Sequence, residues 1–275
     1  MGKFAAMILA GVVSLGSAAL LPAKAAEGPS LDVLANGAHR SDANKARNIY
    51  RHPVETLSFF GLKPDMTVVE LWPSSGWYTE IIAPYVNAQG QYYANVYVKP
   101  GDPEFNSSAV QLLKDKFAAH PDLYGNARIT VMTLPQNPNI APAGSADMVL
   151  TFRNLHNWLE QGTTHVMLKA IYRALKPGGI FGVVDHRGDE SKPQDPKAPM
   201  GYVNQAYAIK IIEKAGFKLV DASEINANSR DDRNHPKGVW TLPPTLALKD
   251  QDREKYLKIG ESDRFTLKFI KPAKK

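Results

Sequence analysis

Polar residues that could do chemistry follow three apolar segments of this sequence. The first segment carries one acid, Glu70. Polar groups follow the second and third segments directly, namely Arg153, Asn154, His156 and Asn157, and then Asp185, His186 and Arg187. Histidine and carboxylate side chains are common general acids and bases. We therefore predict that His156 and Asp185 are catalytic and that one of them accepts a proton from a bound molecule.

Aromatic residues border the same segments. Three of the four tryptophans, Trp72, Trp77 and Trp158, lie close to these polar groups in the sequence. Ligand pockets are commonly apolar or aromatic cavities with a few fixed polar groups. We predict a pocket whose substrate-binding residues are Trp77, Tyr78, Asn157, His186, Arg187 and Tyr202. Tyr78 and Tyr202 could equally be packing residues.

Other kinds of chemistry find less support in the sequence. Glu70, His156, Asp185 and His186 are residue types that bind zinc or iron, but no short HxH, HxxH or HExxH spacing occurs, so no metal site is predicted. The chain has no cysteine, which excludes disulfides, thiolate ligands and cysteine nucleophiles. It contains neither the G-x-S-x-G turn of α/β-hydrolases nor a Walker-type GKS or GKT sequence.

The elements that must position these residues can be read from hydrophobic periodicity. Apolar runs predict strands at 67–71, 92–98, 128–133, 147–152, 180–185 and 218–223, and an alternating run predicts a half-buried, antiparallel strand at 264–270. Helical patterns lie between them at 76–86, 105–119, 164–175 and 203–215. Such alternation indicates a mostly parallel sheet with helices on both faces. In an open parallel sheet ligands bind beyond the carboxyl ends of the strands, so we expect Glu70, His156 and Asp185 around one pocket, with Arg153 or Arg187 balancing the acids.

The ends and linkers of the chain suggest how it is organised. The segment 4–21 is apolar, follows Lys3 and precedes an A-x-A sequence at 23–25, which predicts a signal peptide at 1–25 and a periplasmic or secreted protein. A membrane anchor is the alternative, and no later run is long enough to cross a bilayer. We expect a helical arm at 26–60 and a second domain at 61–275. The irregular segments 186–201 and 226–262 are lids or links.

The charge of the chain is a weaker guide to its partners. The formal net charge is +6, without a long basic run outside the tail, which indicates a solvated basic surface rather than a nucleic-acid site.

Three segments give the sequence a resemblance to a known family. They are "VVELWPSSGWYTEIIAPYV" (68–86), "ADMVLTFRNLHNWL" (146–159) and "MLKAIYRALKPGGIFGVVDHR" (167–187). In this order they resemble class I S-adenosylmethionine-dependent methyltransferases, and more closely the exported bacterial proteins predicted to be such enzymes. The resemblance covers about residues 60 to 270. It implies a Rossmann-like fold with a seven-stranded sheet and an antiparallel last strand.

The resemblance also implies a cofactor and the residues that hold it. The family's turn has glycines at three alternating positions, which here are Trp72, Ser74 and Gly76, and the acid that ends its second strand is replaced near Asn95. The cofactor implied is S-adenosyl-L-methionine, bound by Glu70, Trp72, Ser74, Gly76, Asn95 and Asn154. The function implied is methyl transfer to a small molecule. The altered turn and the export signal leave open a non-catalytic periplasmic binding protein that kept the fold.

Overall fold

A single twisted sheet organises the chain. The structure is a computed structural model that describes residues 1–2, 28–98, 101 and 103–273. Its seven strands stand in the order β3-β2-β1-β4-β5-β7-β6, and neighbours pair in parallel except β7, which is antiparallel to both β5 and β6. The strands are β1 (Thr67–Leu71), β2 (Gln91–Tyr97), β3 (Ala127–Met132), β4 (Ala146–Phe152), β5 (Leu175–His186), β6 (Lys218–Ser223) and β7 (Arg264–Ile270). The predicted Rossmann-like fold is confirmed.

Alternation along the strands sends side chains to two separate cores. In β1, Val68 packs in one core, whereas Val69 and Leu71 pack in the other. In β5, Val183 shares the core of Val69, and Val184 shares that of Val68. Because successive residues of a strand point to opposite faces, the central strands β1 and β5 present one apolar row to each layer of helices.

The N-terminal helices cover one face of the sheet. Leu34 of α1 (Leu31–Ala35) and Phe60 of α4 (Pro53–Phe60) share a core with Ile81 of α5 (Thr79–Val86) and Leu113 of α6 (Pro103–Ala119). The short helices α2 (Asp42–Lys45), α3 (Asn48–Arg51) and α7 (Pro121–Tyr124) complete this part of the chain. The predicted helical arm is therefore packed on the same core as the predicted domain.

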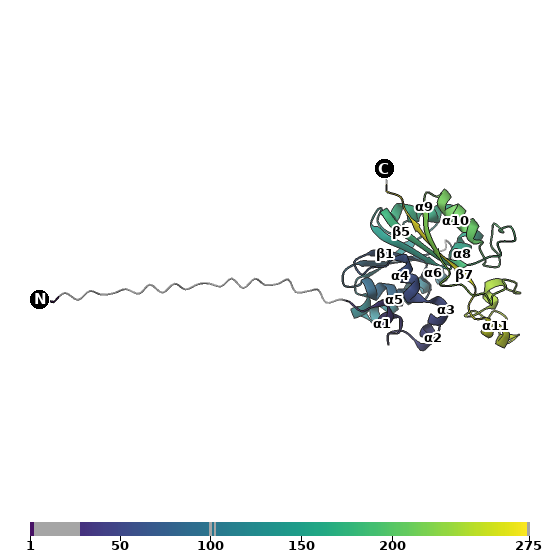
Figure 1. Ribbon diagram of the computed structural model, residues 1–275, viewed down its shortest axis with the longest axis horizontal. Helices are drawn as coiled ribbons and strands as arrows, with labels where there is room; N and C mark the ends of the chain where they lie inside the picture. The colour runs from purple at the N-terminus through teal and green to yellow at the C-terminus, as the bar shows by residue number, and fades with distance from the viewer. Residues whose placement is uncertain (3–27, 99–100, 102, 274–275) are drawn as a thin grey trace.

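The other face carries α8 (Leu155–Glu160), α9 (Thr164–Ala174) and α10 (Gln205–Lys214), as Figure 1 shows for α9 and α10 across the sheet from α4 and α5. Trp158 of α8 is fully buried there, with Ile171 of α9 and Ile212 of α10. The irregular segment before β7 holds a 3-10 turn, η1 (Gly238–Thr241), and α11 (Arg253–Ile259).

Several predicted boundaries move by a few residues. The helix expected from Gly76 begins at Thr79, because the residues before it form the turn that follows β1. The helix expected to end at Leu175 ends at Ala174, and β5 begins at once, so the Gly178 and Gly179 pair lies inside the strand. Residues 3–25 of the predicted signal peptide lie outside the described residues. No helix in the described part of the chain is long and apolar enough to span a bilayer.

Candidate functional site

Two adjoining cavities open at the carboxyl ends of β1 and β4. We call the first the polar cavity. Its volume is about 270 Å³, and the residues that line it include Arg51, Arg153, His156, His186 and Glu261. We call the second the apolar cavity; its volume is about 310 Å³, and Val96, Tyr97, Ala109 and Leu112 help to line it. Four residues belong to both walls, namely Trp72, Pro73, Ser74 and Asn154. The predicted cleft beyond the strand ends is thus divided into two neighbouring compartments.

The turn after β1 has the backbone of a glycine turn without most of its glycines. Trp72, Ser74 and Gly76 have φ angles of 48°, 55° and 81°. A positive φ costs a residue with a Cβ roughly 1–2 kcal/mol, so the first two positions adopt this shape against their own preference. All three alternating positions therefore keep a positive φ, although only Gly76 is the glycine of the family pattern.

The Trp72 indole points into the core that α8 covers. It stacks on Tyr97 with ring centroids 4.6 Å apart and an interplanar angle of 17°, and its edge meets Trp158 at 6.1 Å. The indole Nε1–H donates to Met132 Sδ at 3.4 Å. These contacts fix the ring, and Trp72 lines both cavities.

Glu70 is buried in a hydrogen-bonded group of its own. Thr79 Oγ1 donates to Glu70 Oε2 at 2.8 Å, and the Tyr92 hydroxyl donates to the same oxygen. Burial raises the pKa of Glu70 to about 7, against the lowering effect of these two hydrogen bonds. The carboxylate ties β1, α5 and β2 together at the base of the turn.

The side chains of Glu70 and Asp185 leave the sheet on opposite faces. Glu70 lies two residues after Val68 and therefore points to the same face of the sheet as Val68. Asp185 lies two residues after Val183 and points to the face of Val183, which packs in the other core. The prediction that the carboxylates of Glu70 and Asp185 surround one small ligand is therefore wrong, although Glu70 borders the polar cavity. The role of Glu70 in cofactor binding stays a prediction.

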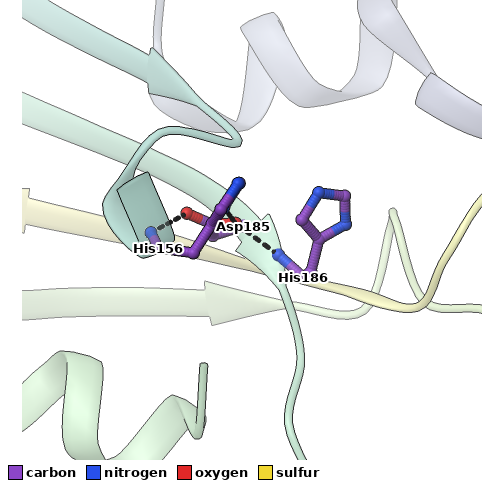
Figure 2. Close-up of side chains that lie close together, drawn as sticks. All are labelled: His156, Asp185 and His186. Carbon is purple, nitrogen blue, oxygen red and sulfur yellow. Dashed lines mark hydrogen bonds and ion pairs between the residues drawn. The ribbon is translucent and has the colours of Figure 1, made fainter. Parts of the chain in front are cut away.

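His156 and Asp185 form a close pair. His156 Nδ1 lies 2.9 Å from Asp185 Oδ1, and the main-chain N–H groups of His156 and His186 also donate to this carboxylate, at 3.2 and 2.7 Å (Figure 2). Since a carboxylate only accepts, Nδ1 carries the proton and Nε2 is left with a lone pair. His156 lines the polar cavity, and its Nε2 bonds to none of the described residues. The geometry is that of a general base with an orienting acid.

His186 lies beside this pair and is neutral. Its ring centroid is 5.2 Å from that of His156, and its Nδ1 contacts Ser262 Oγ. Burial lowers the pKa of His186 well below the ordinary value, and the nearby His156, Arg153, Arg264 and Arg51 lower it further. A neutral imidazole in this position can accept or donate a hydrogen bond in the cavity.

His156, Asp185 and His186 also have the types of ligand atom that a metal needs. One such atom from each lies within 4.8 Å of the other two. Asp185 already accepts three N–H bonds, however, and the arginines close to His186 repel a cation. These surroundings favour a proton-transfer role over a metal site.

Most of the predicted site residues reach the polar cavity. Trp77, Tyr78, Asn154, Asn157 and His186 line it, together with His156. Asn154 Nδ2 donates to the Leu71 carbonyl at 2.9 Å, which fixes the amide against the end of β1. Arg153 lines the cavity as well, but among the described residues neither Arg153 nor Arg187 forms an ion pair with Glu70 or Asp185, so the expected balance of these acids is not found.

Five predicted site residues line neither cavity: Gly76 in the turn after β1, Asp185 behind His156, and Asn95, Arg187 and Tyr202, which lie elsewhere. Asn95 is fully buried, and its Nδ2 donates to Thr130 at 3.1 Å, so it reaches neither cavity and Tyr97 lines the apolar cavity in its place. Arg187 pairs with Glu224 at 2.7 Å and with Asp263 at 3.6 Å. The Tyr202 hydroxyl donates to Asp231, with its oxygens at 2.9 and 3.0 Å. The placement of Arg187 and Tyr202 corrects their assignment to the substrate pocket, because both are engaged in surrounding loops.

Residues from the ends of the chain line the polar cavity without having been predicted. Arg51 comes from α3 in the arm, and Trp240, Glu261 and Ser262 come from the irregular segment before β7. The length of that segment was the one signal in the sequence that pointed to it. Nothing in the local pattern around Arg51 distinguishes it from a surface arginine.

Comparisons with known proteins concern the fold. No family model matches the sequence, and no curated protein is significantly similar to it. Among solved structures, an S-adenosylmethionine-dependent methyltransferase from Aquifex aeolicus is 18% identical with a TM-score of 0.54, and the match covers 82% of this chain and 93% of that one. The [4+2]-cyclase SpnF is 17% identical with a TM-score of 0.60, covering 87% and 86%. The S-adenosylmethionine-dependent methyltransferase SibL is 14% identical with a TM-score of 0.52, covering 84% and 57%.

At these identities the likeness establishes the fold and leaves the reaction to be argued from the site. One of the three structures is described as a cyclase, so the architecture alone does not decide the chemistry. The chain has the fold of the class I S-adenosylmethionine-dependent methyltransferases.

Proposed function

We propose that this protein transfers a methyl group from S-adenosylmethionine to a small molecule. The observation that carries the proposal is the wall shared by the two cavities, with the His156 and Asp185 pair on the polar side of it. A transferase needs two compartments that meet at the reacting atoms, since methyl transfer depends mainly on in-line positioning.

The residues of the apolar cavity fit the cofactor. The turn at 72–76 has the positive φ angles that let backbone approach a ligand closely, and Gly76 allows α5 to begin beside it. Tyr97 and Val96 stand at the end of β2, where an adenosine is held in folds of this kind. Ser74 is exposed, and its hydroxyl can hydrogen-bond a polar part of the cofactor.

The polar cavity supplies the chemistry on the acceptor side. S-adenosylmethionine brings an electrophilic methyl group on a positively charged sulfur. His156 accepts the proton of the acceptor's hydroxyl or amine at Nε2 while Asp185 holds Nδ1–H and stabilises the imidazolium that forms. Trp77, Tyr78 and Phe152 offer aromatic walls, and Tyr78 stacks on Phe152 at 3.6 Å. From the volume of the polar cavity, about 270 Å³, and its aromatic walls, we infer that the acceptor is a small molecule and not a nucleic acid.

Calorimetric titration with S-adenosylmethionine and S-adenosylhomocysteine tests the proposal. Gly76→Ala and Gly144→Ala form a matched pair, because both glycines have positive φ, 81° and 64°, and only Gly76 belongs to the turn. A Cβ at Gly76 would also lie 3.1 Å from Thr79, whereas one at Gly144 would meet nothing within 4 Å. We expect the wild-type protein and Gly144→Ala to bind both ligands and Gly76→Ala to bind them at least tenfold more weakly. Absence of binding to the wild-type protein would instead support the binding-protein alternative.

We further propose that the protein works outside the inner membrane, on the strength of the signal-peptide pattern at 1–25. The cofactor would then have to reach that compartment.

A further inference from the structure

Arg51 holds a buried guanidinium whose outer edge has no partner. Its side chain is 1% exposed, and its Nε donates to both oxygens of Glu261, at 2.9 and 3.2 Å. The guanidinium carbon lies 4.7 Å from the centre of the Trp77 ring, which covers one face. Nη1 and Nη2 are buried and bond to none of the described residues. Leaving such buried donors unmet is costly, and more so for a charged group.

Positive charge exceeds negative charge around this edge. Glu261 accepts hydrogen bonds from Arg47, Arg51 and Arg264, so one carboxylate serves three guanidinium groups. Burial lowers the pKa of Arg51 well below its ordinary value, and the nearby Arg153 lowers it further. The cluster therefore has an excess of positive charge that an anion would balance.

Arg153 adds a second free guanidinium on the same wall. Its side chain is half-buried, lines the polar cavity and makes no hydrogen bond or ion pair with any described residue. Its φ is 63°, so the backbone that aims this side chain is itself in a disfavoured conformation. Burial lowers the pKa of Arg153 to about 10, against the opposing effect of Glu261. Two arginines with open donors thus face one cavity.

We infer that Arg51 and Arg153 form a subsite for a carboxylate, and that the molecule acted on in the polar cavity is a small carboxylic acid. A carboxylate matches the two parallel N–H groups of one guanidinium edge and can be held by a second arginine at the same time. The acid's nucleophilic group would then lie on the His156 side of the cavity. This inference rests on the proposed function in placing an acceptor there.

Benzoate is a suitable probe, because a cavity of about 270 Å³ with aromatic walls accommodates one ring. Benzamide has the same shape without the charge. We expect benzoate to bind saturably in calorimetry, benzamide to bind at least tenfold more weakly, and Arg153→Met and Arg51→Met each to reduce benzoate affinity at least tenfold. Arg51→Lys keeps the charge and loses the fork, so it should fall between Arg51→Met and the wild-type protein.

Arg128→Met is the matched control. Arg128 is an exposed arginine on β3, and the edge position of that strand separates it from the polar cavity. The Arg128→Met protein should bind benzoate with the affinity of the wild-type protein. If Arg51→Met fails to fold, Arg153→Met decides the matter, since Arg153 has no bond to lose. Equal binding of benzoate and benzamide, or benzoate affinity unchanged in Arg153→Met, overturns the inference.

The cofactor's own carboxylate is the other possible source of the anion, and a second titration separates the two. S-adenosylhomocysteine carries a carboxylate, and methylthioadenosine lacks it. Suppose that Arg51→Met and Arg153→Met weaken the binding of S-adenosylhomocysteine but not of methylthioadenosine, and that benzoate competes with S-adenosylhomocysteine. The subsite then belongs to the cofactor, and the inference about the acceptor fails. The protein could also bind benzoate through both arginines and bind neither S-adenosylhomocysteine nor methylthioadenosine. That result would support the carboxylate subsite and refute only the methyltransferase proposal.

Discussion

Asp185 Oδ1 lies 2.9 Å from His156 Nδ1, and the same carboxylate also accepts the main-chain N–H groups of both His156 and His186. One buried acid thereby fixes the orientation of a ring on α8 from the end of β5. The arrangement keeps Nε2 of His156 available at the cavity wall.

This relationship predicts the protonation pattern of a single histidine. In nitrogen-15 spectra of the neutral rings, His156 should carry its proton on Nδ1. Asp185→Asn offers an amide donor in the same place, so the proton should move to Nε2 in a measurable fraction of molecules. His156→Gln should lower kcat for any acceptor by about 100-fold or more, while the affinity for S-adenosylhomocysteine stays the same. His165→Gln, at an exposed histidine, is the control for both measurements. An Nε2–H tautomer in the wild-type protein would contradict the general-base assignment.

Replacing Trp72 with glycine separates the backbone of the turn from its side chain. The change relieves roughly 1–2 kcal/mol of backbone strain but removes the stack on Tyr97 and the contact with Trp158. Because a large half-buried ring contributes more than this relief, we expect Trp72→Gly to lower the free energy of unfolding by about 1–2 kcal/mol. Cofactor binding should stay the same or weaken, since the indole points into the core.

Urea unfolding and calorimetry of Trp72→Gly check these two effects. Tyr97→Leu removes the other ring of the stack without altering the turn, so it should destabilise the protein with no compensating relief. Tighter binding of S-adenosylmethionine in Trp72→Gly would mean that the indole occupies the cofactor's space.

The buried carboxyl of Glu70 predicts a specific pH dependence. Its pKa rises from 4.5 to about 7 on folding, chiefly through burial, so the folded state favours the protonated form. The stabilisation is complete below about pH 4.5 and is lost as the pH rises through 7, with a magnitude on the order of 3 kcal/mol. The wild-type protein should therefore lose more stability between pH 5 and pH 8 than Glu70→Gln does.

Urea titrations at the two pH values measure this difference, and groups common to both proteins cancel. Asp147→Asn is a useful comparison, because Asp147 is only part-buried and pairs with Lys176. Parallel pH profiles for the wild-type protein and Glu70→Gln would show that Glu70 is ionised in the folded protein throughout this range.

Export can be tested at the N-terminus of the protein recovered from its own host. Cleavage after Ala25 should leave Ala26 as the first residue, and intact-mass spectrometry of a periplasmic fraction measures this directly. Changing Ala23 and Ala25 together to lysine should leave uncleaved protein. An uncleaved chain in the membrane fraction of unmodified cells would support the anchor alternative.

The sequence predicted the sheet well because each strand depends on a local pattern. The bounds of β1, β6 and β7 agree with the predicted ranges. β7 is antiparallel as predicted, but it is not half-buried, because its position between β5 and β6 buries Arg264 and Thr266 as well as Phe265 and Leu267. The sequence also allowed the proximity of His156 and Asp185 to be predicted, since they follow the ends of β4 and β5, which lie side by side.

The rest of the site depends on contacts between distant parts of the chain. Asn95 was assigned by its place near the end of β2, yet its side chain is fully buried against Thr130, and Tyr97, the last residue of the strand, lines the cavity instead. Arg51 could not be recognised because its burial is produced by Glu261 and Trp77. The strained turn at Trp72 likewise has no local signature, because a tryptophan there predicts an ordinary φ.

The ion pair between Arg51 and Glu261 joins residues 210 positions apart, one from the helical arm and one from the segment that leads into the last strand. A ribosome must therefore synthesise the chain at least as far as Glu261 before this corner of the cavity can assemble. Until then Arg47 and Arg51 lack their shared carboxylate, and partly made chains have no complete binding site. Ligand binding thus requires chains in which Arg51 and Glu261 have met, and a ligand that fits the cavity would selectively stabilise those chains.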